Sequence, residues 1–255
     1  MSSWLGLWVL SLAQSSAPGS FHGWKTDCEY RFVWSQDRQK VGETTLRWSL
    51  MGENRETPAV RWKIDCRRSY DRLGISQRSS SMTLCDAAGF VIQYEDRTDV
   101  TANVGKKAKQ VTNIGLTGEK AHVTYTQEGK TQPRIEAVLP AGTRLTASQA
   151  IEHWILFLAT WSREPETRDQ DLYYPDFGRV LRVTFRRGSE EKVRIGSGEI
   201  VTVPHAFKAA RESLEGTVWL DKNSRLVQIE FINALKPELT LRVTLADETP
   251  GAKDK

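Results

Sequence analysis

The sequence predicts a mainly β fold of the α+β class, with antiparallel strands gathered around one central helix at about residues 147–162. Apolar and polar residues alternate over many short segments, which is typical of strands that bury one face. Gly118-Glu119 and Gly129-Lys130 separate neighbouring segments and suit hairpin turns. The alternation gives way to helical spacing in one place, which predicts a single helix.

The strand pattern runs through both halves of the chain. Residues 41–50 place Leu46, Trp48 and Leu50 on one face of a strand, and residues 178–187 alternate in the same way. Further strands are expected at residues 30–34, 59–66, 81–85, 90–95, 109–118, 120–127, 134–139, 191–195, 199–210, 216–221, 225–234 and 239–247.

The central helix carries apolar side chains nearly all round its circumference. Thr146, with Gln149 three residues later, predicts a capping box at its start, and Pro165 predicts its end near residue 162. About fifteen residues at about 1.5 Å each give a rod of about 22 Å. A membrane-spanning helix needs about 20 apolar residues. We therefore expect a helix covered by strands, and no transmembrane helix in the mature chain.

Length and composition fit one globular domain. The chain has 255 residues, of which 39% are hydrophobic and 27% charged, proportions that differ from those of disordered or multi-span membrane proteins. We predict one β-rich domain over residues 27–247, or two halves over residues 27–140 and 168–247 joined by the helix. A loose, charged tail is expected over residues 248–255.

The charge balance predicts no nucleic-acid partner. The formal net charge is only +4, and the basic residues are spread over several short groups near predicted turns or strand ends. Solvated hairpin tips explain such groups, and no nucleic-acid-binding motif favours the alternative. The groups are Arg67-Arg68, Lys106-Lys107 with Lys109, and Arg186-Arg187.

The first residues resemble a secretory signal peptide. An apolar core over residues 4–12 is followed by small residues, which suits cleavage near residue 13 or residue 17. No Lys or Arg precedes the core, so an apolar first strand is the alternative. Residues 1–17 are therefore expected to direct export to the periplasm or to the outer face of a bacterial envelope.

Three cysteines permit one disulfide and one free thiol. Cys66 and Cys85 lie on neighbouring predicted strands if the hairpin turns near Gly74, so they are the first choice for a disulfide. Cys28 with either partner, or three buried thiols, are the alternatives.

Two stretches of the sequence echo each other. Residues 84–95 (LCDAAGFVIQYE) resemble residues 219–230 (WLDKNSRLVQIE), and Asp86 and Asp221 occupy matching positions. Two related strand meanders with the helix between them are one interpretation. Chance similarity between amphipathic hairpins is the other.

Three stretches carry a family resemblance: residues 41–48 (VGETTLRW), 173–183 (YYPDFGRVLRV) and 216–231 (GTVWLDKNSRLVQIEF). With the N-terminal segment, they resemble bacterial extracytoplasmic proteins of unknown function and, more distantly, the periplasmic lipoprotein-carrier superfamily. The resemblance covers most of residues 28–247. It implies a curved antiparallel sheet, or half-barrel, wrapped around one or more helices, with a concave face that binds acyl chains and has no catalytic residues. No residue matches a family binding motif, so no site is transferred.

The sequence contains no recognisable catalytic or metal-binding constellation. His153 stands beside Glu152, but adjacent helical positions point about 100° apart and do not form a dyad. His22, His122 and His205 have no local partner motif. We therefore predict no catalytic residue, no metal and no cofactor.

The aromatic residues are the candidate ligand-binding set. Trp154, Phe157 and Trp161 on the helix are expected to face Trp48 and Trp62 on the sheet. A tight fit makes these residues a solid core, whereas an open half-barrel makes them the lining of an apolar cleft. Residues 167–178 are expected to form a polar loop, and its Tyr173 and Tyr174 could form the rim of such a cleft.

The leading hypothesis is therefore a non-enzymatic binding module of the cell envelope that holds a lipid or another apolar ligand. A structural or interaction protein with a filled core and an envelope partner is the alternative. A hydrolase whose site is assembled only by the fold ranks third. A cytoplasmic lipid binder stays open if the first residues are not a signal.

Overall fold

The computed structural model describes residues 20–26, 28–52, 60–72, 74–102, 107–147, 150–161, 166–210, 214–232 and 240–250. The predicted signal peptide, Gln149 of the predicted capping box and residues 251–255 of the predicted tail lie outside these ranges.

The described residues contain nineteen strands, one α-helix and one short 3-10 helix. The strands are β1 (Ser20–Phe21), β2 (Trp24–Lys25), β3 (Cys28–Gln36), β4 (Gln39–Leu50), β5 (Trp62–Arg72), β6 (Ile75–Cys85), β7 (Val91–Ala102), β8 (Lys107–Thr117), β9 (Lys120–Gln127), β10 (Lys130–Thr131), β11 (Ile135–Val138), β12 (Arg144–Leu145), β13 (Thr167–Tyr174), β14 (Arg179–Arg187), β15 (Glu191–Ile195), β16 (Gly198–Ala209), β17 (Glu215–Asp221), β18 (Leu226–Ile232) and β19 (Leu241–Pro250). The helices are α1 (Ile151–Ala159) and η1 (Pro175–Phe177).

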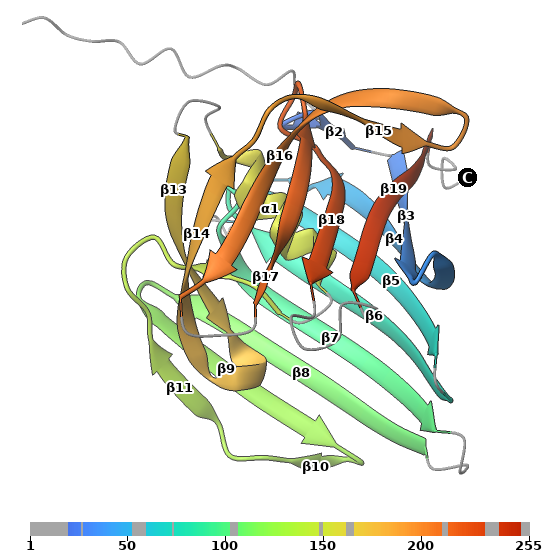
Figure 1. The fold of residues 1–255 in the computed structure, drawn as a ribbon. Helices are drawn as coiled ribbons and strands as arrows, with labels where there is room; N and C mark the ends of the chain where they lie inside the picture. The colour runs from blue at the N-terminus through green and yellow to red at the C-terminus, as the bar shows by residue number, and fades with distance from the viewer. Residues whose placement is uncertain are drawn as a thin grey trace, which may run out of the picture.

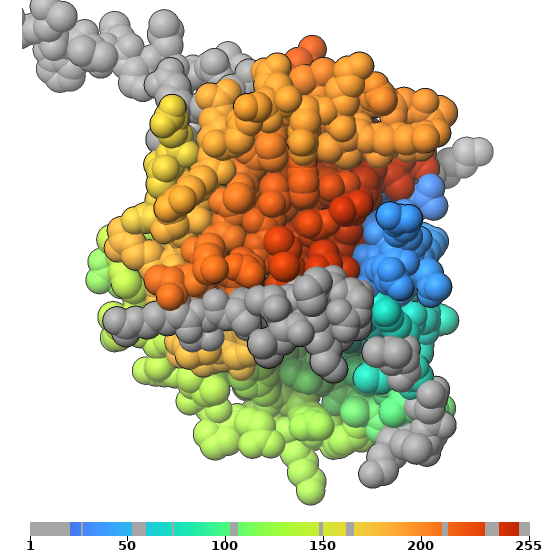
Figure 2. All heavy atoms as spheres, viewed as in Figure 1, coloured from blue at the N-terminus to red at the C-terminus, as the bar shows by residue number. Residues whose placement is uncertain are grey.

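One strongly curved sheet wraps around α1, which confirms the predicted fold class (Figure 1). Paired strands follow one another without a break from β12 through β13, β14, β16–β19 and β3–β9 to β11. The β19–β3 pair joins the two ends of the chain within this sheet. From this side, the side chains of β14–β19 close over the helix (Figure 2).

The pair β12–β13 departs from the antiparallel prediction, because these two strands run parallel. Parallel neighbours need a crossover connection, usually a helix. Here α1 is that crossover, and it passes through the inside of the curved sheet (Figure 1). Residues 167–174, which the sequence predicts as loop, form β13 because they pair along their whole length with β14.

The helix is shorter than predicted, and its cap is different. α1 begins after Ala150, which makes no side-chain cap, and all nine of its residues are buried. The predicted cap residue, Thr146, is fully buried, and its backbone N–H donates to the Tyr173 carbonyl (2.9 Å). Thr146 therefore extends the pairing between β12 and β13, and the helix starts later than the predicted cap at Thr146. At the other end, Thr160 closes the helix through its hydroxyl to the Phe157 carbonyl (2.8 Å).

Aromatic side chains fill the space between helix and sheet. The Trp154 ring lies 5.0 Å from Phe207 and 5.4 Å from Phe231, measured between ring centroids. At the other end of the core, Phe21 and Trp24 of the β1–β2 hairpin stack on Trp48 at 5.2 and 6.1 Å. Each large side chain buried in this way contributes about 1.5–3 kcal/mol, so the helix and the hairpin are held mainly by aromatic packing.

The two echoing stretches form the same turn. The carboxylate of Asp86 accepts hydrogen bonds from the N–H groups of Ala88 and Phe90 (2.9 and 2.8 Å). Asp221 accepts from the equivalent groups of Asn223 and Arg225 (2.8 and 2.9 Å). Both hairpins also shift register at matching positions, between residues 84 and 85 and between residues 219 and 220. The shared geometry supports the interpretation of two related meanders, which stays a prediction.

The register of β5 and β6 contradicts the predicted disulfide. Their hairpin turns at Gly74 as expected, but Cys66 lies opposite Ser81 and Cys85 lies opposite Trp62. The two cysteines are thus four positions apart along the hairpin, about 13 Å at strand spacing and beyond disulfide reach. All three cysteines are free.

The predicted tail also begins later than expected. Residues 248–250 belong to β19 and pair with residues 28–30 of β3. Glu248 forms ion pairs with Lys25 (2.8 Å) and Arg225 (3.0 Å), and these contacts hold the C-terminal end of β19.

Gly216→Ala is expected to destabilise the fold. An added Cβ would lie 1.9 Å from the Glu230 carbonyl oxygen and 2.7 Å from the Phe207 ring. Overpacking of this kind costs about 1–3 kcal/mol. Urea denaturation should show that loss, whereas Gly115→Ala, a strand glycine with no atom within 4 Å of its added Cβ, should change stability little. Equal stabilities of the two variants would contradict the close approach at Gly216.

Candidate functional site

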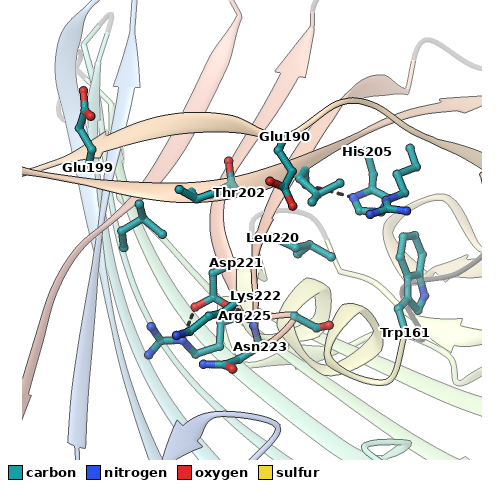
Figure 3. Close-up of a pocket in the computed structure, with 15 residues that line it drawn as sticks. Trp161, Glu190, Glu199, Thr202, His205, Leu220, Asp221, Lys222, Asn223 and Arg225 are labelled. Atoms are coloured by element: carbon teal, nitrogen blue, oxygen red, sulfur yellow. Dashed lines mark hydrogen bonds and ion pairs between the residues drawn. The ribbon is translucent and has the colours of Figure 1, made fainter.

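A pocket of about 490 Å³ opens beyond the C-terminal end of α1, between the β15–β16 hairpin and the β17–β18 turn (Figure 3). The first half of β16 pairs with β15 and its second half with β14, so the β15–β16 hairpin projects beyond the body of the sheet. This projection forms one wall of the pocket, and the turn that begins at Asp221 forms another.

The floor of the pocket is apolar and its rim is charged. Trp161 and Leu220 are buried beneath it, and Val203 lies directly opposite Leu220 on the neighbouring strand. Exposed charged side chains of both signs stand around this floor, and they are Glu190, Glu199 and Lys222. Such a floor and rim suit a ligand with an apolar body and a polar end.

The wall at the β17–β18 turn is preorganised. Asp221 accepts two backbone hydrogen bonds from its own turn and an ion pair from Arg225 (2.8 Å). Arg225, in the turn, also reaches Glu248 on β19 (3.0 Å), so contacts to β17 and β19 hold this wall in place. A ligand that enters here need not order the turn, which lowers the entropic cost of binding.

His205 is a titratable side chain that contacts the apolar floor. Its ring lies 5.7 Å from the Trp161 ring, and its Nδ1 lies 3.2 Å from the Val203 carbonyl oxygen. Burial lowers the pKa of His205, and the Arg187 charge adds to the effect, so the ring is neutral at pH 7. Within the described part of the chain, no carboxylate lies within hydrogen-bonding distance of this ring, and the geometry supports a polar contact to a ligand more directly than general-base chemistry.

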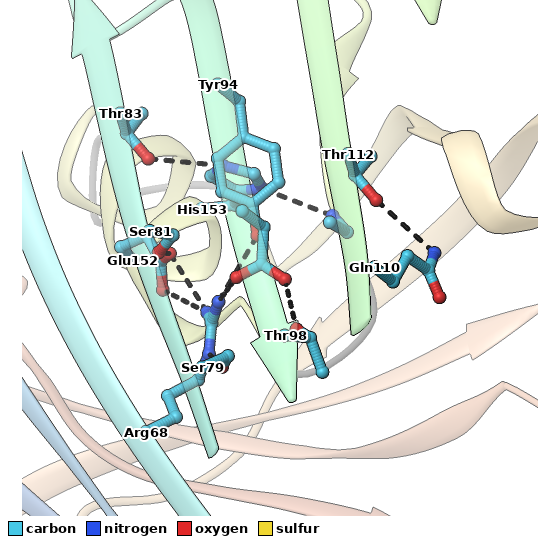
Figure 4. A network of polar contacts seen from close by, with 12 residues as sticks. Arg68, Ser79, Ser81, Thr83, Tyr94, Thr98, Gln110, Thr112, Glu152 and His153 are labelled. Carbon is cyan, nitrogen blue, oxygen red and sulfur yellow. Dashed lines mark hydrogen bonds and ion pairs between the residues drawn. The ribbon is translucent and has the colours of Figure 1, made fainter. Parts of the chain in front are cut away.

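A second polar cluster lies inside the sheet, at the N-terminal end of α1 (Figure 4). Arg68 on β5 donates from Nη1 to both carboxylate oxygens of Glu152 on α1 (3.0 and 3.2 Å) and from Nε to Ser79 Oγ (3.0 Å). Its Nη2 donates to Asp96 and to the Tyr94 hydroxyl (3.3 Å). The guanidinium is therefore bonded on all three nitrogens, which suits a structural role.

Glu152 is ionised despite complete burial. Burial acts to raise the pKa of Glu152, but the Arg68 charge, the neighbouring His153 and the Ser81 hydrogen bond (2.7 Å) outweigh it and lower the pKa. A buried charge needs such compensation, and a fully bonded pair can supply it.

His153 is a satisfied core histidine. Its Nδ1 accepts a hydrogen bond from the Ala147 N–H (3.1 Å), and its Nε2 lies 3.5 Å from Thr83 Oγ1. Burial lowers its pKa to about 4, so the ring is neutral at pH 7 and holds the chain at the start of α1. The His153 ring nitrogens face Ala147 and Thr83, whereas the Glu152 carboxylate faces Arg68 and Ser81.

The structure brings one of the seven predicted ligand-binding residues to the pocket beyond α1. Trp161 lines it, whereas the other six are buried in the packed core, where each is at most 6% exposed. Tyr173 and Tyr174 are both buried, and as consecutive residues of the strand β13 they point to opposite faces of the sheet. Ligand contact by the six stays a prediction. They are Trp48, Trp62, Trp154, Phe157, Tyr173 and Tyr174.

The sequence patterns did not predict the Arg68–Glu152 ion pair or the pocket position of Val203 and Leu220. Arg68 was grouped with Arg67 at a strand end, yet it continues the inward face of Trp62, Ile64 and Cys66 at period two. A charge on that face and a carboxylate on an apolar helix each need a partner, and this signal could have paired Arg68 with Glu152. The pocket side chains Val203 and Leu220 carried no comparable signal, because any alternating strand contains such residues.

The fold and the pocket define a class: curved, mainly antiparallel sheets wrapped around a single helix, with a pocket beyond the helix end. No family model matches the chain, and no curated protein matches it in sequence. Among solved structures it is similar to a β-barrel-like protein of a domain of unknown function, DUF1849, from Brucella abortus. The TM-score is 0.57 at 12% identity, over 88% of this chain and 98% of that chain. At such identity the likeness shows the fold alone.

Two further bacterial structures are more distant. A DUF1089 family protein from Pseudomonas aeruginosa has a TM-score of 0.44 at 10% identity, over 89% of this chain and 94% of that chain. A Bacteroides fragilis protein with a YmcC-like fold has a TM-score of 0.29 at 10% identity, over 88% and 96%.

The described residues contain no helix that is both long enough and apolar enough to cross a membrane.

His153 is expected to make stability fall in mild acid. Its pKa is lower in the folded protein (about 4) than its usual 6.5, so the unfolded chain binds a proton first as the pH drops. The contribution is complete above about pH 6.5 and declines towards pH 4, by up to about 1.4 kcal/mol per pH unit. Chemical denaturation at pH 7 and pH 5 measures this decline. His153→Gln should flatten it, and an unchanged slope in that variant would contradict the assignment.

Arg68→Met is expected to cost about 3–5 kcal/mol, because it leaves the buried Glu152 carboxylate without its partner. Arg68→Met/Glu152→Met should recover part of that loss by removing both charges. Urea denaturation at pH 7 compares them. Arg182→Met, which removes an exposed pair with Asp169, is the control and should have little effect. A loss at Arg68 no larger than the control's would show that the buried pair is not structural.

Proposed function

We propose that the protein is a non-enzymatic binding module for a lipid or another apolar ligand that carries a polar end. The observation that carries the proposal is the pocket beyond α1, with its Trp161 and Leu220 floor and its charged rim. A volume of about 490 Å³ lies within the range of small-molecule sites, about 300–1,000 Å³. The resemblance to lipoprotein carriers is consistent with an apolar ligand.

The ligand's apolar body lies against the Trp161 ring and over the paired side chains of Val203 and Leu220, and its polar end meets the rim at His205 and Glu190. Figure 3 shows Trp161, Leu220, His205 and Glu190 arranged around one space. The packed core below the floor excludes deeper entry, because Phe185 lies 4.6 Å from the Trp161 ring.

The same proposal places the protein in the cell envelope. Its support is the apolar segment at residues 4–12 followed by small residues. Sequencing the N-terminus of the protein purified from its host tests this part: a start near residue 14 or 18 supports export, and an intact N-terminus contradicts it.

A structural or interaction protein of the envelope is the second candidate. The observation in its favour is the filled core, in which Trp154 and Phe157 are both at most 2% exposed. If the pocket takes no ligand, the working surface lies on the outside of the sheet.

Val203→Phe is expected to weaken ligand binding at least tenfold, because the larger ring fills the space over Leu220. Native mass spectrometry and intrinsic tryptophan fluorescence, with fatty acids and lysophospholipids as probes, measure binding. Val138→Phe makes the same change at a side chain that is 75% exposed on β11 and should leave binding unchanged. Absence of any bound mass or fluorescence change in the unaltered protein would favour the second candidate.

A further inference from the structure

The outward face of β5–β8 carries a basic hollow of about 750 Å³ that is separate from the pocket beyond α1. Arg67, Arg78, Arg97 and Lys109 line it, and all four are exposed. Their strands lie side by side in the sheet (Figure 1). The alternation of the strands turns these side chains away from the helix, because Cys66 and Ser79 beside them are buried.

The strand register sets the spacing of the four charges. Arg67 and Arg97 lie in one row across the sheet, on either side of Ser80. Arg78 and Lys109 lie in the next row, on either side of Asp99. Two strand spacings separate the members of each row by about 10 Å, and two residues separate the rows by about 7 Å.

The local charge is positive after its carboxylates are counted. Asp71 and Asp99 are the two acidic residues in the lining, against the four outward cationic side chains. Arg97 pairs with Glu95 in water-exposed surroundings (2.7 Å), a contact that contributes little. Among the described residues, no ion-pair partner is found for Arg67 or Arg78. The fifth basic residue of the lining, Arg68, is occupied by Glu152 and Asp96.

We propose that this hollow binds a ligand that carries two or more phosphate groups. A guanidinium group matches phosphate oxygens with two parallel hydrogen bonds, and Ser69 and Ser80 add hydroxyl groups to the same surface. One phosphate cannot contact both ends of a row whose members are about 10 Å apart. A ligand with several phosphates is therefore expected to bind more tightly than a single phosphate. The site does not depend on the pocket beyond α1, because the two share no lining residue.

The phosphates can belong to a soluble molecule or to the headgroups of a membrane, and the experiment separates the two sources. Inositol hexakisphosphate and inorganic phosphate are titrated calorimetrically into the full chain at low salt. Vesicles of phosphatidylglycerol with phosphatidylcholine are compared with vesicles of phosphatidylcholine alone in a sedimentation assay.

The triple variant Arg67→Gln/Arg78→Gln/Arg97→Gln is expected to weaken binding about 100-fold, since each basic residue contributes roughly fivefold at a phosphate surface. Arg182→Gln/Lys192→Gln/Lys208→Gln removes three exposed charges elsewhere and should weaken binding less than threefold. Asp99→Asn removes a carboxylate between two cations and should tighten binding, an effect that partial unfolding would not produce.

Hexakisphosphate binding without vesicle binding identifies a soluble ligand, and binding to phosphatidylglycerol vesicles identifies membrane headgroups. Both outcomes support the proposal if the triple variant Arg67→Gln/Arg78→Gln/Arg97→Gln weakens binding about 100-fold. It is overturned if neither probe binds, if inorganic phosphate binds as tightly as hexakisphosphate, or if the two triple variants lose affinity equally.

Discussion

The structure depends on burying a helix that has no exposed side. All nine residues of α1 lie inside the curved sheet, because the helix is the crossover between the parallel strands β12 and β13. Every polar group that it carries must therefore find its partner within the protein. Arg68 reaches across to Glu152, and the Ala147 N–H donates to His153. The aromatic rings around Trp154 fill the remaining space.

This constraint decides where a ligand could enter. A sheet that closes tightly on the helix leaves its concave face occupied, so Trp154 and Phe157 serve the core. In the part of the chain that the structure describes, the space beside the helix that is large enough for a ligand lies beyond its last turn, where the β15–β16 hairpin extends past the body of the sheet. The polar turn at Asp221 faces that space, and the equivalent turn at Asp86 packs over Phe21 through Gly89. Two similar turns thus meet different surroundings in the two halves.

The outward face of β5–β8 differs from the inward face in its balance of charges. Side chains there alternate with buried ones along the same strands, so the register that places Arg68 against Glu152 also places Arg67 outside. On the inward face, the charge of Arg68 is compensated by Glu152 and Asp96. The outward face carries more cationic side chains than carboxylates. One set of strands therefore supports both a structural ion pair and a charged surface.

Local pattern alone determined much of the fold. Alternation at period two predicted the strands, the helical run predicted the single helix, and Gly74 predicted the turn of the β5–β6 hairpin. These features are local, since they depend on neighbouring residues and on the need to bury apolar faces. Only the tertiary structure decided the register that separates Cys66 from Cys85, the strand that replaces the predicted loop at Tyr173, and the meeting of Arg68 with Glu152. The pocket at Trp161 belongs to the same group, because it arises from segments that are far apart in the chain and are brought together by curvature of the sheet.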